Sequence, residues 1–372
     1  MEEIGKEAQK NIWKAAIPLL VHLHDSEITS LPPPNPLLIL APRLGYLPLI
    51  APQLKACFSS TLPPGDDTVW FEYKGMPLKW YIPTGVLFDL LCAEPESPWK
   101  LTVHFRGYPS HILTPCEGED AVKWNFINSL KEAVYIMNGN CKNIMNMSQS
   151  DQSALWRSVL DGNLEGFLKV TSKLKLGVVE DKYVFYPSFK PPSTTGNIDN
   201  TNLVKTGKIP IRLYVRTVLE VFDDLEDVPE IDSWESVSCI NRPIEFDNDE
   251  GTYMTLGDAM KTLLPEYFTE RPENNETTAR DELIEEHSGD PIDTGISGEG
   301  APTVTDSSES IKTSSNLKVG LIRIHHCEPP LNAPLSWVVN NLMFPDHFLH
   351  VCVYLIHKKS SFRRVIGSLL VL

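Results

Sequence analysis

The sequence lacks the features that would tie it to a membrane interior or to an oxidising compartment. No apolar stretch approaches the roughly 20 residues that a membrane-spanning helix needs. The seven cysteines include no Cys-x-x-Cys pair, and the first residues are charged where a signal peptide would be apolar. We therefore expect a reducing, cytosolic compartment, with the thiols as small core residues and any membrane contact peripheral.

Basic residues are scarce, since 33 Lys and Arg stand against 49 Asp and Glu and the formal net charge is −16. No basic footprint for a phosphate backbone is visible, which argues against nucleic acid as a partner. The acidic excess is concentrated between residues 270 and 310, where twelve acidic residues accompany two arginines. This segment has too little apolar surface to offset the entropy of ordering, so we predict a disordered acidic insertion at about residues 268–314.

Motifs of nucleotide binding and nucleophilic catalysis are also missing: there is no P-loop, no Gly-x-Gly-x-x-Gly and no Ser elbow. Residue types suited to metal or thiol chemistry do occur, at His325, His326 and Cys327 and again at His347 and His350. On a strand, adjacent residues point to opposite faces, as do residues three apart, so neither group converges by itself. A cysteine- or metal-dependent hydrolase built from His and Cys residues of the C-terminal domain is the alternative function, although we expect no catalytic residues, no metal and no cofactor.

A length of 372 residues favours two or three domains. In the first 105 residues, segments with the hydrophobic period of a strand alternate with segments that have the period of a helix. Residues 5–15 are helical in pattern, and Pro18 leads into an extended run. The segments that follow from there are strand 17–23, strand 37–40, helix 46–58, strand 68–73, strand 78–82, helix 86–92 and strand 99–105. This is the order of a ubiquitin-like β-grasp, so we predict an N-terminal helix at 1–15 and a first ubiquitin-like domain at 16–107.

A helix-rich domain is predicted at residues 119–175. Its first helix carries an apolar stripe whose members fall within about 80° of one another at 100° per residue: Val122, Phe126, Leu130, Ala133 and Met137. Lys131 lies about 140° from the centre of this stripe and should point away from the core, with Trp124 and Ile127 within about 40° of it.

A second helix of this domain is predicted after a cap at residues 148–151, with Gly162 and Gly166 as the places where it would break. Two tryptophans, Trp13 and Trp124, are more typical of domain-interface core than of a ligand cage.

A second set of strand and helix patterns follows a linker-like stretch at residues 191–196. Its segments are strand 209–218, strand 236–246, helix 255–264, strand 319–325, helix 334–342 and strand 348–355. Thr255 is expected to cap the first helix and Pro265 to stop it. The order resembles that of the first unit with one strand fewer, so we predict a second ubiquitin-like domain at 205–356, interrupted by the acidic insertion, and a basic, then apolar tail at 357–372.

Several motifs, in order, resemble the autophagy protein 5 family over about residues 8–355. They are Leu38–Pro42 with the adjoining Arg43–Leu47, Phe126–Ala133 around Lys131, Thr255–Asp258, and Pro334–Trp337 with Phe344–His350. The resemblance implies an α+β fold in which two ubiquitin-like β-grasp domains flank a helix-rich domain. The acidic insertion is longer than the family pattern requires, and the tail runs past the expected last strand.

The resemblance also implies a function in autophagy. Lys131 falls on the lysine that the family joins, by an isopeptide bond, to the C-terminal glycine of the ubiquitin-like autophagy protein 12. Family members bind a helix of autophagy protein 16 in a groove to which both ubiquitin-like domains contribute. The conjugate acts like an E3 ligase in transferring autophagy protein 8 to phosphatidylethanolamine during autophagosome assembly.

On this reading the chain is a non-catalytic subunit, cytoplasmic and peripheral at the isolation membrane or pre-autophagosomal structure. An amine attacks a thioester only when unprotonated, and a free lysine with a pKa of about 10.4 is unprotonated in roughly one molecule in a thousand or fewer at neutral pH. Activation would therefore come from E1-like and E2-like autophagy enzymes, while this chain offers a lysine in a fixed helical frame.

Overall fold

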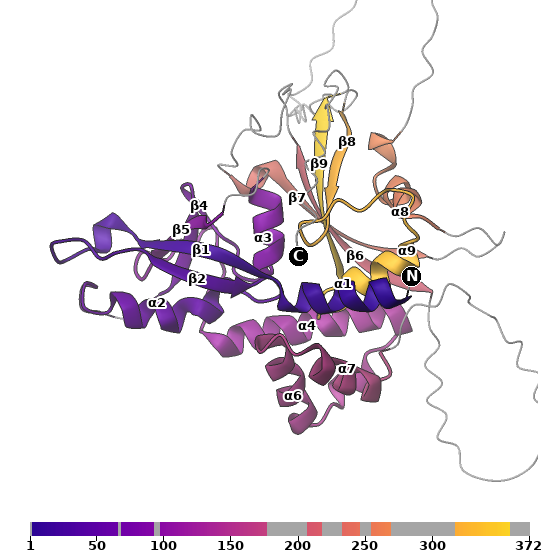
Figure 1. Cartoon of the computed structure of the whole chain (residues 1–372), viewed down its shortest axis with the longest axis horizontal. Helices are drawn as coiled ribbons and strands as arrows, with labels where there is room; N and C mark the ends of the chain where they lie inside the picture. Colours follow the sequence, from indigo (N-terminus) through magenta and orange to yellow (C-terminus); the bar gives the residue numbers. More distant parts are fainter. Residues whose placement is uncertain are drawn as a thin grey trace, which may run out of the picture. The chain divides into compact units, whose positions relative to one another are not determined.

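The computed structural model describes residues 2–65, 68–92, 97–176, 207–217, 233–245, 254–268 and 317–357. All of these belong to one compact unit that contains two sheets and a group of helices (Figure 1). The predicted acidic insertion and the predicted tail lie outside the described residues, except for Phe268 and His357 at their edges. The disorder predicted for the insertion therefore concerns residues that the structure does not describe.

The first sheet contains five strands in the order β2-β1-β5-β3-β4. The strands are β1 (Ala16–Leu23), β2 (Leu37–Pro42), β3 (Trp70–Tyr73), β4 (Met76–Pro77) and β5 (Trp99–His104). The central pair, β1 and β5, is parallel and the other pairs are antiparallel. Along β1, alternate residues from Ile17 to Leu23 are buried, which is the period-2 pattern of a half-buried strand. The helices α2 (Ala51–Phe58) and α3 (Thr84–Leu91) complete this β-grasp.

The strand predicted at residues 78–82 is wrong. The hairpin turns over only two residues, Lys74 and Gly75, both in the left-handed region at φ 50° and 87°. Such turns match the twist of paired strands, so β4 begins already at Met76, opposite Tyr73. Leu78 still donates its backbone N–H to Phe71 at 2.8 Å, after which the chain leaves the sheet.

The second sheet has the order β7-β6-β9-β8, with β6 and β9 parallel. Its strands are β6 (Lys208–Thr217), β7 (Val237–Glu245), β8 (Leu317–Arg323) and β9 (Leu349–His357), and its helices are α8 (Leu256–Leu263) and α9 (Leu335–Leu342). Thr255 caps α8 through a reciprocal capping box with Asp258, as the sequence predicts. The prediction of two ubiquitin-like β-grasp domains flanking a helix-rich domain is confirmed.

The remaining helices are α1 (Glu2–Lys14), α4 (Glu119–Asn138), α5 (Lys142–Met145), α6 (Gln149–Leu160) and α7 (Leu164–Lys173). Short 3-10 turns occur at η1 (Asp25–Glu27), η2 (Leu47–Ile50), η4 (Trp234–Ser236) and η5 (Pro265–Tyr267). Ser148 caps α6, and the second predicted helix breaks at Gly162, whose φ of 62° cannot continue an α-helix.

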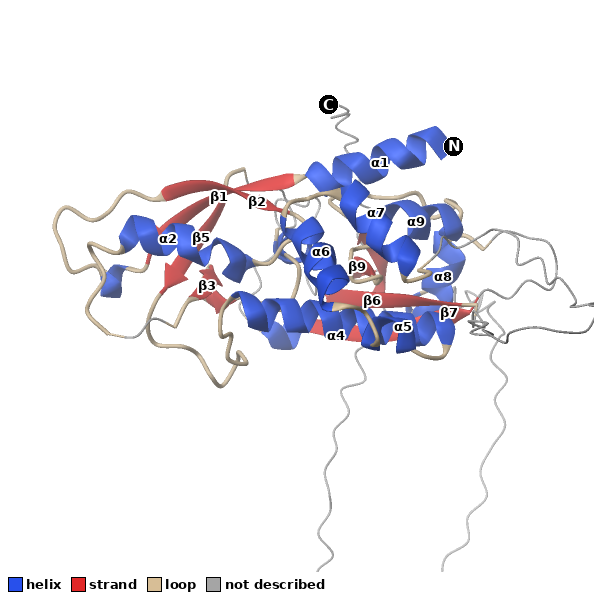
Figure 2. Ribbon diagram, turned by 90° about the horizontal axis from the view of Figure 1, so that it is seen from below, coloured by secondary structure: helices blue, strands red, loops and turns tan. Residues whose placement is uncertain are grey.

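Contacts between elements join the two sheets through the helices. Figure 2 shows α4 running along β6, while α1 lies beside α7 and α9. Trp13 is buried, with its ring 4.7 Å from that of Phe167, so the interface role predicted for it is confirmed. Trp124 differs, because half of its surface is exposed.

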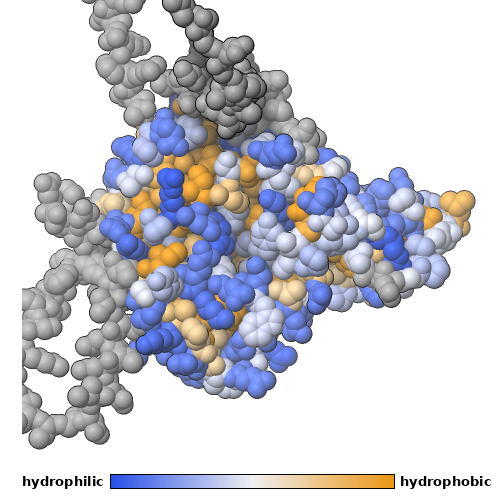
Figure 3. Space-filling model, turned by 180° about the vertical axis from the view of Figure 1, so that it is seen from behind, coloured by the Kyte–Doolittle hydropathy of each residue, from blue (hydrophilic) through white to orange (hydrophobic). Residues whose placement is uncertain are grey.

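The outer surface is mixed in character. On the face shown in Figure 3, apolar residues form separate patches among hydrophilic ones. No helix in the described ranges combines the length and apolarity needed to cross a bilayer.

Candidate functional site

Helix α4 supplies the frame of the candidate site. Gly118 precedes it and Gly139, in the left-handed region at φ 69°, ends it. The predicted stripe is confirmed, with four of its members buried and Met137 partly buried. Ile127 is buried as well, which the sequence did not predict. Because η2, α5 and β6 contact α4 from different sides, the buried arc is wider than the apolar stripe.

Lys131 lies on the remaining, outward arc of α4, and its side chain is half-buried. Its Nζ lies 3.4 Å from Asn128 Oδ1, near the outer limit of a hydrogen bond. Within the described residues it makes no ion pair with a carboxylate. The amine is thus reachable from outside without breaking a strong interaction.

The neighbours of Lys131 on this arc are uncharged. Trp124, Asn128, Lys131 and Tyr135 recur at the i, i+4, i+7 and i+11 positions that share one helix face. Trp124 is 50% exposed and Tyr135 is 61% exposed. The lysine therefore lies between two open aromatic rings.

The opposite flank of α4 is fastened to the second sheet by polar contacts. Ser129 Oγ donates to Asp346 Oδ2 at 2.7 Å and accepts from Arg212 Nη1 at 3.2 Å. Arg212 Nη2 donates to Glu132 Oε2 at 3.2 Å, and its guanidinium lies 4.0 Å from the centre of the Phe348 ring. We call these five residues the α4 clamp. Its two members on α4, Ser129 and Glu132, are close to Lys131 in the sequence but point to a different side of the helix.

The Asp346 carboxylate of the α4 clamp is also part of a buried chain of hydrogen bonds, which we call the relay. His350 places Nε2 3.1 Å from Asp346 Oδ2 and Nδ1 3.0 Å from the Tyr214 hydroxyl. Burial would raise the pKa of Asp346, but the nearby His350 and Arg212, with the Ser129 hydrogen bond, lower it to about 2. Burial lowers the pKa of His350 and raises that of Tyr214, which favours the neutral form of both. The neutral His350 ring then donates a hydrogen bond from Nε2 to Asp346 and accepts one at Nδ1 from the Tyr214 hydroxyl.

A second polar cluster joins the first ubiquitin-like domain to the second. Asp89, at the end of α3, accepts from Arg43 Nη2 at 2.6 Å on both oxygens. It also accepts from the backbone N–H of His326 at 2.8 Å, and its own carbonyl accepts from the Tyr354 hydroxyl at 2.7 Å. Burial would raise the pKa of Asp89, but the His326 hydrogen bond and the Arg43 charge lower it. Arg43, in one of the family-like motifs, therefore fixes an interdomain contact.

The histidines and cysteines considered for metal or thiol chemistry do not form a catalytic set. His325 and His326 lie in a tight turn, at φ 50° and 66°, and not on a strand as predicted. The described residues contain no cluster of three His, Cys, Asp or Glu side chains able to hold a metal. Burial and the nearby Asp89 raise the pKa of Cys327, which disfavours a thiolate nucleophile. The hydrolase alternative finds no support.

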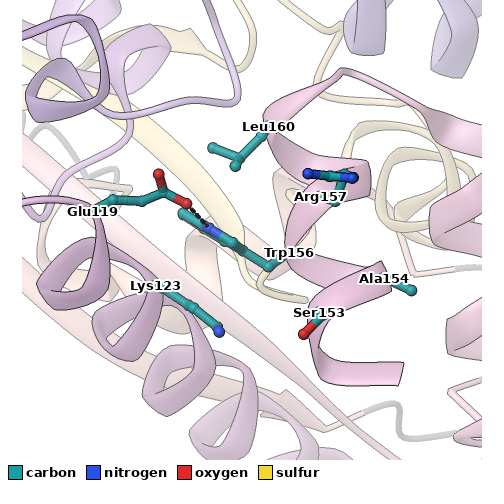
Figure 4. Close-up of a pocket in the computed structure, with 7 residues that line it drawn as sticks. All are labelled: Glu119, Lys123, Ser153, Ala154, Trp156, Arg157 and Leu160. Atoms are coloured by element: carbon teal, nitrogen blue, oxygen red, sulfur yellow. Dashed lines mark hydrogen bonds between the residues drawn. The ribbon is translucent and has the colours of Figure 1, made fainter. Parts of the chain in front are cut away.

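A pocket of about 430 Å³ between α4 and α6 was not predicted from the sequence (Figure 4). Its lining consists of Glu119, Lys123, Ser153, Ala154, Trp156, Arg157 and Leu160. Trp156 Nε1 donates to Glu119 Oε1 at 2.8 Å, with Lys123 and Arg157 on opposite sides of the indole. The lining holds no His or Cys, and its charged side chains are Glu119, Lys123 and Arg157.

Comparisons with known proteins agree with this architecture. Three family models of autophagy protein ATG5 match in order: the UblA domain at residues 12–105, the alpha-helical bundle region at 119–177 and the UblB domain at 208–353. Autophagy protein 5 of Arabidopsis thaliana is 52% identical over 353 residues, which cover 94% of this chain and 98% of the relative. The protein of the same name from Oryza sativa subsp. indica is 50% identical over 359 residues, covering 94% and 93%.

A solved structure shares the fold. The crystal structure of Kluyveromyces marxianus Atg5 superimposes with a TM-score of 0.58 at 18% identity, covering 95% of this chain and all of that one. The three domain matches and the relatives that are similar over almost the whole length lead to one conclusion: the chain belongs to the autophagy protein 5 family.

Proposed function

We propose that this chain carries the ubiquitin-like autophagy protein 12 on Lys131. The Lys131 Nζ attacks the thioester carbonyl of the modifier's C-terminal glycine, an N–C bond forms, the C–S bond breaks, and the enzyme cysteine leaves as a thiolate. The Lys131 nitrogen loses two protons on the way from ammonium to amide, one before the attack and one from the tetrahedral intermediate, and both pass to the enzyme or to water. The product is an isopeptide bond between the two proteins.

The observation that carries the proposal is the combination of an open amine and a fixed helix. Among the described residues, Lys131 Nζ makes one weak hydrogen bond, to Asn128, whereas Ser129 and Glu132 beside it are held by the second sheet. Such a frame supplies orientation, which lowers the entropic part of the barrier. No carboxylate of the described residues pairs with the amine, so the E2-like enzyme would supply the deprotonating group.

The conjugate is proposed to act as a non-catalytic, E3-like scaffold. A helix of autophagy protein 16 would bind in a groove to which both ubiquitin-like domains contribute, and the cluster around Asp89 supports this by fixing the two domains together. The assembly would promote transfer of autophagy protein 8 to phosphatidylethanolamine. We place it in the cytoplasm, peripheral at the isolation membrane or pre-autophagosomal structure.

Reconstituted conjugation tests the proposal. Purified E1-like and E2-like enzymes, modifier and ATP should convert the wild-type chain into a covalent adduct, and Lys131→Arg should not form it. Lys123→Arg, two turns earlier on α4, is the matched control and should be modified normally. An adduct of undiminished yield on Lys131→Arg, located by peptide mass spectrometry at another lysine, would refute the assignment.

A further inference from the structure

Two exposed aromatic side chains flank Lys131 on α4. At 1.5 Å per residue, Trp124 lies about 10 Å before Lys131 along the helix axis and Tyr135 about 6 Å after it. Asn128 fills the turn between Trp124 and Lys131. The four residues therefore form a neutral strip, apart from the lysine itself, which we call the aromatic strip.

The polar ends of these two rings are unused. Neither the Trp124 indole N–H nor the Tyr135 hydroxyl has a hydrogen-bond partner among the described residues. Four other tryptophans differ, because the indole N–H groups of Trp70, Trp80, Trp156 and Trp234 each donate to an acceptor at 2.7–2.8 Å, whereas that of buried Trp99 has no partner among the described residues. Trp and Tyr combine a large apolar face with one hydrogen-bonding group and are enriched among the residues that dominate binding energy. An open pair of them on one helix face is therefore suited to a protein partner.

We propose that the aromatic strip docks the catalytic face of the thioester-bearing E2-like enzyme, an inference that rests on the proposed acceptor role of Lys131. The transfer requires Lys131 Nζ to come within about 3–3.5 Å of the thioester carbonyl. The reactive cysteine is part of the folded body of the enzyme, so that body must cover α4 around the lysine during transfer. The rings of Trp124 and Tyr135 lie where such a surface would make contact.

The enzyme fits this position better than the modifier does. The modifier's glycine lies at a chain terminus, where each extended residue spans up to about 3.3–3.6 Å. A terminal peptide of a few residues can therefore reach Lys131 while the folded part of the modifier stays away from α4. The docking surface is accordingly expected to be apolar, with an acceptor at its rim for the Trp124 indole.

Single-turnover transfer from preloaded enzyme–modifier thioester, measured over a range of acceptor concentrations, tests the inference. Trp124→Ala should raise the apparent KM for the acceptor about 10- to 30-fold and Tyr135→Ala about 5- to 10-fold, with the maximal rate nearly unchanged. Trp124→Phe should recover part of the loss. Leu168→Ala and Met145→Ala remove other exposed apolar side chains of the helical domain and should leave the KM unchanged.

Binding of the enzyme without modifier provides a second measurement. The Trp124→Ala/Tyr135→Ala double variant should bind the free enzyme at least tenfold more weakly than the wild type. Equal enzyme binding, or a weaker affinity for the free modifier alone, would overturn the inference. If the KM of the double variant is unchanged and Lys131→Arg is inactive, the docking role is refuted while the acceptor assignment stands. If Lys131→Arg is active, the acceptor assignment itself is refuted.

Discussion

Arg212 of β6 donates a hydrogen bond to the carboxylate of Glu132, the residue that follows Lys131, at 3.2 Å. The same guanidinium reaches Ser129 and lies 3.8 Å from buried Asp346. The second ubiquitin-like domain thus determines the orientation of a helix that belongs to the domain before it. The geometry around Lys131 is a property of two domains together.

Replacing Arg212 by Ala should destabilise the protein more than replacing Glu132 by Gln. The first change leaves the buried Asp346 carboxylate with less compensation, for which we expect a loss of about 2–3 kcal/mol in the free energy of unfolding. The second removes a half-exposed partner and should cost about 0.5 kcal/mol. Urea unfolding followed by tryptophan fluorescence measures both, and similar losses would contradict the central role given to Arg212.

Asp89→Asn should be among the most damaging single substitutions in the interface between the ubiquitin-like domains. It removes the charge that compensates the buried Arg43, and breaking such a pair typically costs about 3–5 kcal/mol. Asp25→Asn, at an exposed carboxylate, serves as the control and should change stability by less than about 0.5 kcal/mol. Thermal melting of both variants decides the matter, and a wild-type melting temperature for Asp89→Asn would contradict the prediction.

Stability should fall as the pH is lowered from 7 to 4. Burial lowers the pKa of His325 from 6.5 to about 3, so between these values the unfolded chain binds a proton that the folded chain does not. The resulting slope is about 1.4 kcal/mol per pH unit for this one residue, and the stabilisation is fully present above pH 6.5. Burial lowers the pKa of His347 to about 4, which adds a second contribution of the same sign.

The variant His325→Phe separates this contribution from the others. It removes the titrating ring that stacks on Phe344 and should flatten the dependence between pH 6 and 4 by about 1.4 kcal/mol per unit, even though it also loses the contact to the Leu342 carbonyl. Ser110→Ala, at an exposed position that does not titrate, serves as the control and should leave the slope as it is. Chemical unfolding at several pH values gives the slopes, and identical slopes for wild type and His325→Phe would exclude this residue as a source.

Thr255→Ala should cost about 1 kcal/mol by removing the capping box of α8. Thr255→Ser keeps the side-chain oxygen that accepts from the Asp258 backbone N–H and should recover most of this loss. Hydrogen exchange of the first-turn amides of α8 provides a local reading, because those amides should exchange faster in the Ala variant alone. Unchanged protection in Thr255→Ala would show that the cap does not hold the helix end.

The elements with a local period could be predicted from the sequence. The apolar stripe of α4, the capped start of α8 and the extended run of β1 each depend on residues within a few positions of one another, and the structure contains all three. The prediction of a strand at 78–82 was wrong because the length of the preceding turn decides where the next strand begins. The residue types of Lys74 and Gly75 indicate that length only weakly.

The clamp on α4 could not be predicted in this way. Ser129 and Asp346 are 217 positions apart, and no periodicity relates them. His347 and His350 attracted attention as chemical groups, yet His350 belongs to a buried structural relay and His347 packs against Phe167. Their residue types alone do not distinguish these roles, because the distinction depends on burial.

Asp346 and Phe348 lie directly before β9, the last described strand, whereas the helix they hold ends at Asn138. During synthesis α4 therefore emerges long before the residues that seat it. A nascent or prematurely terminated chain would display Lys131 on a helix that lacks its polar contacts to Asp346, and only a protein translated through its final sheet would hold the helix from that side as well. The placement of these contacts would make the proposed modification of Lys131 dependent on completion of the polypeptide.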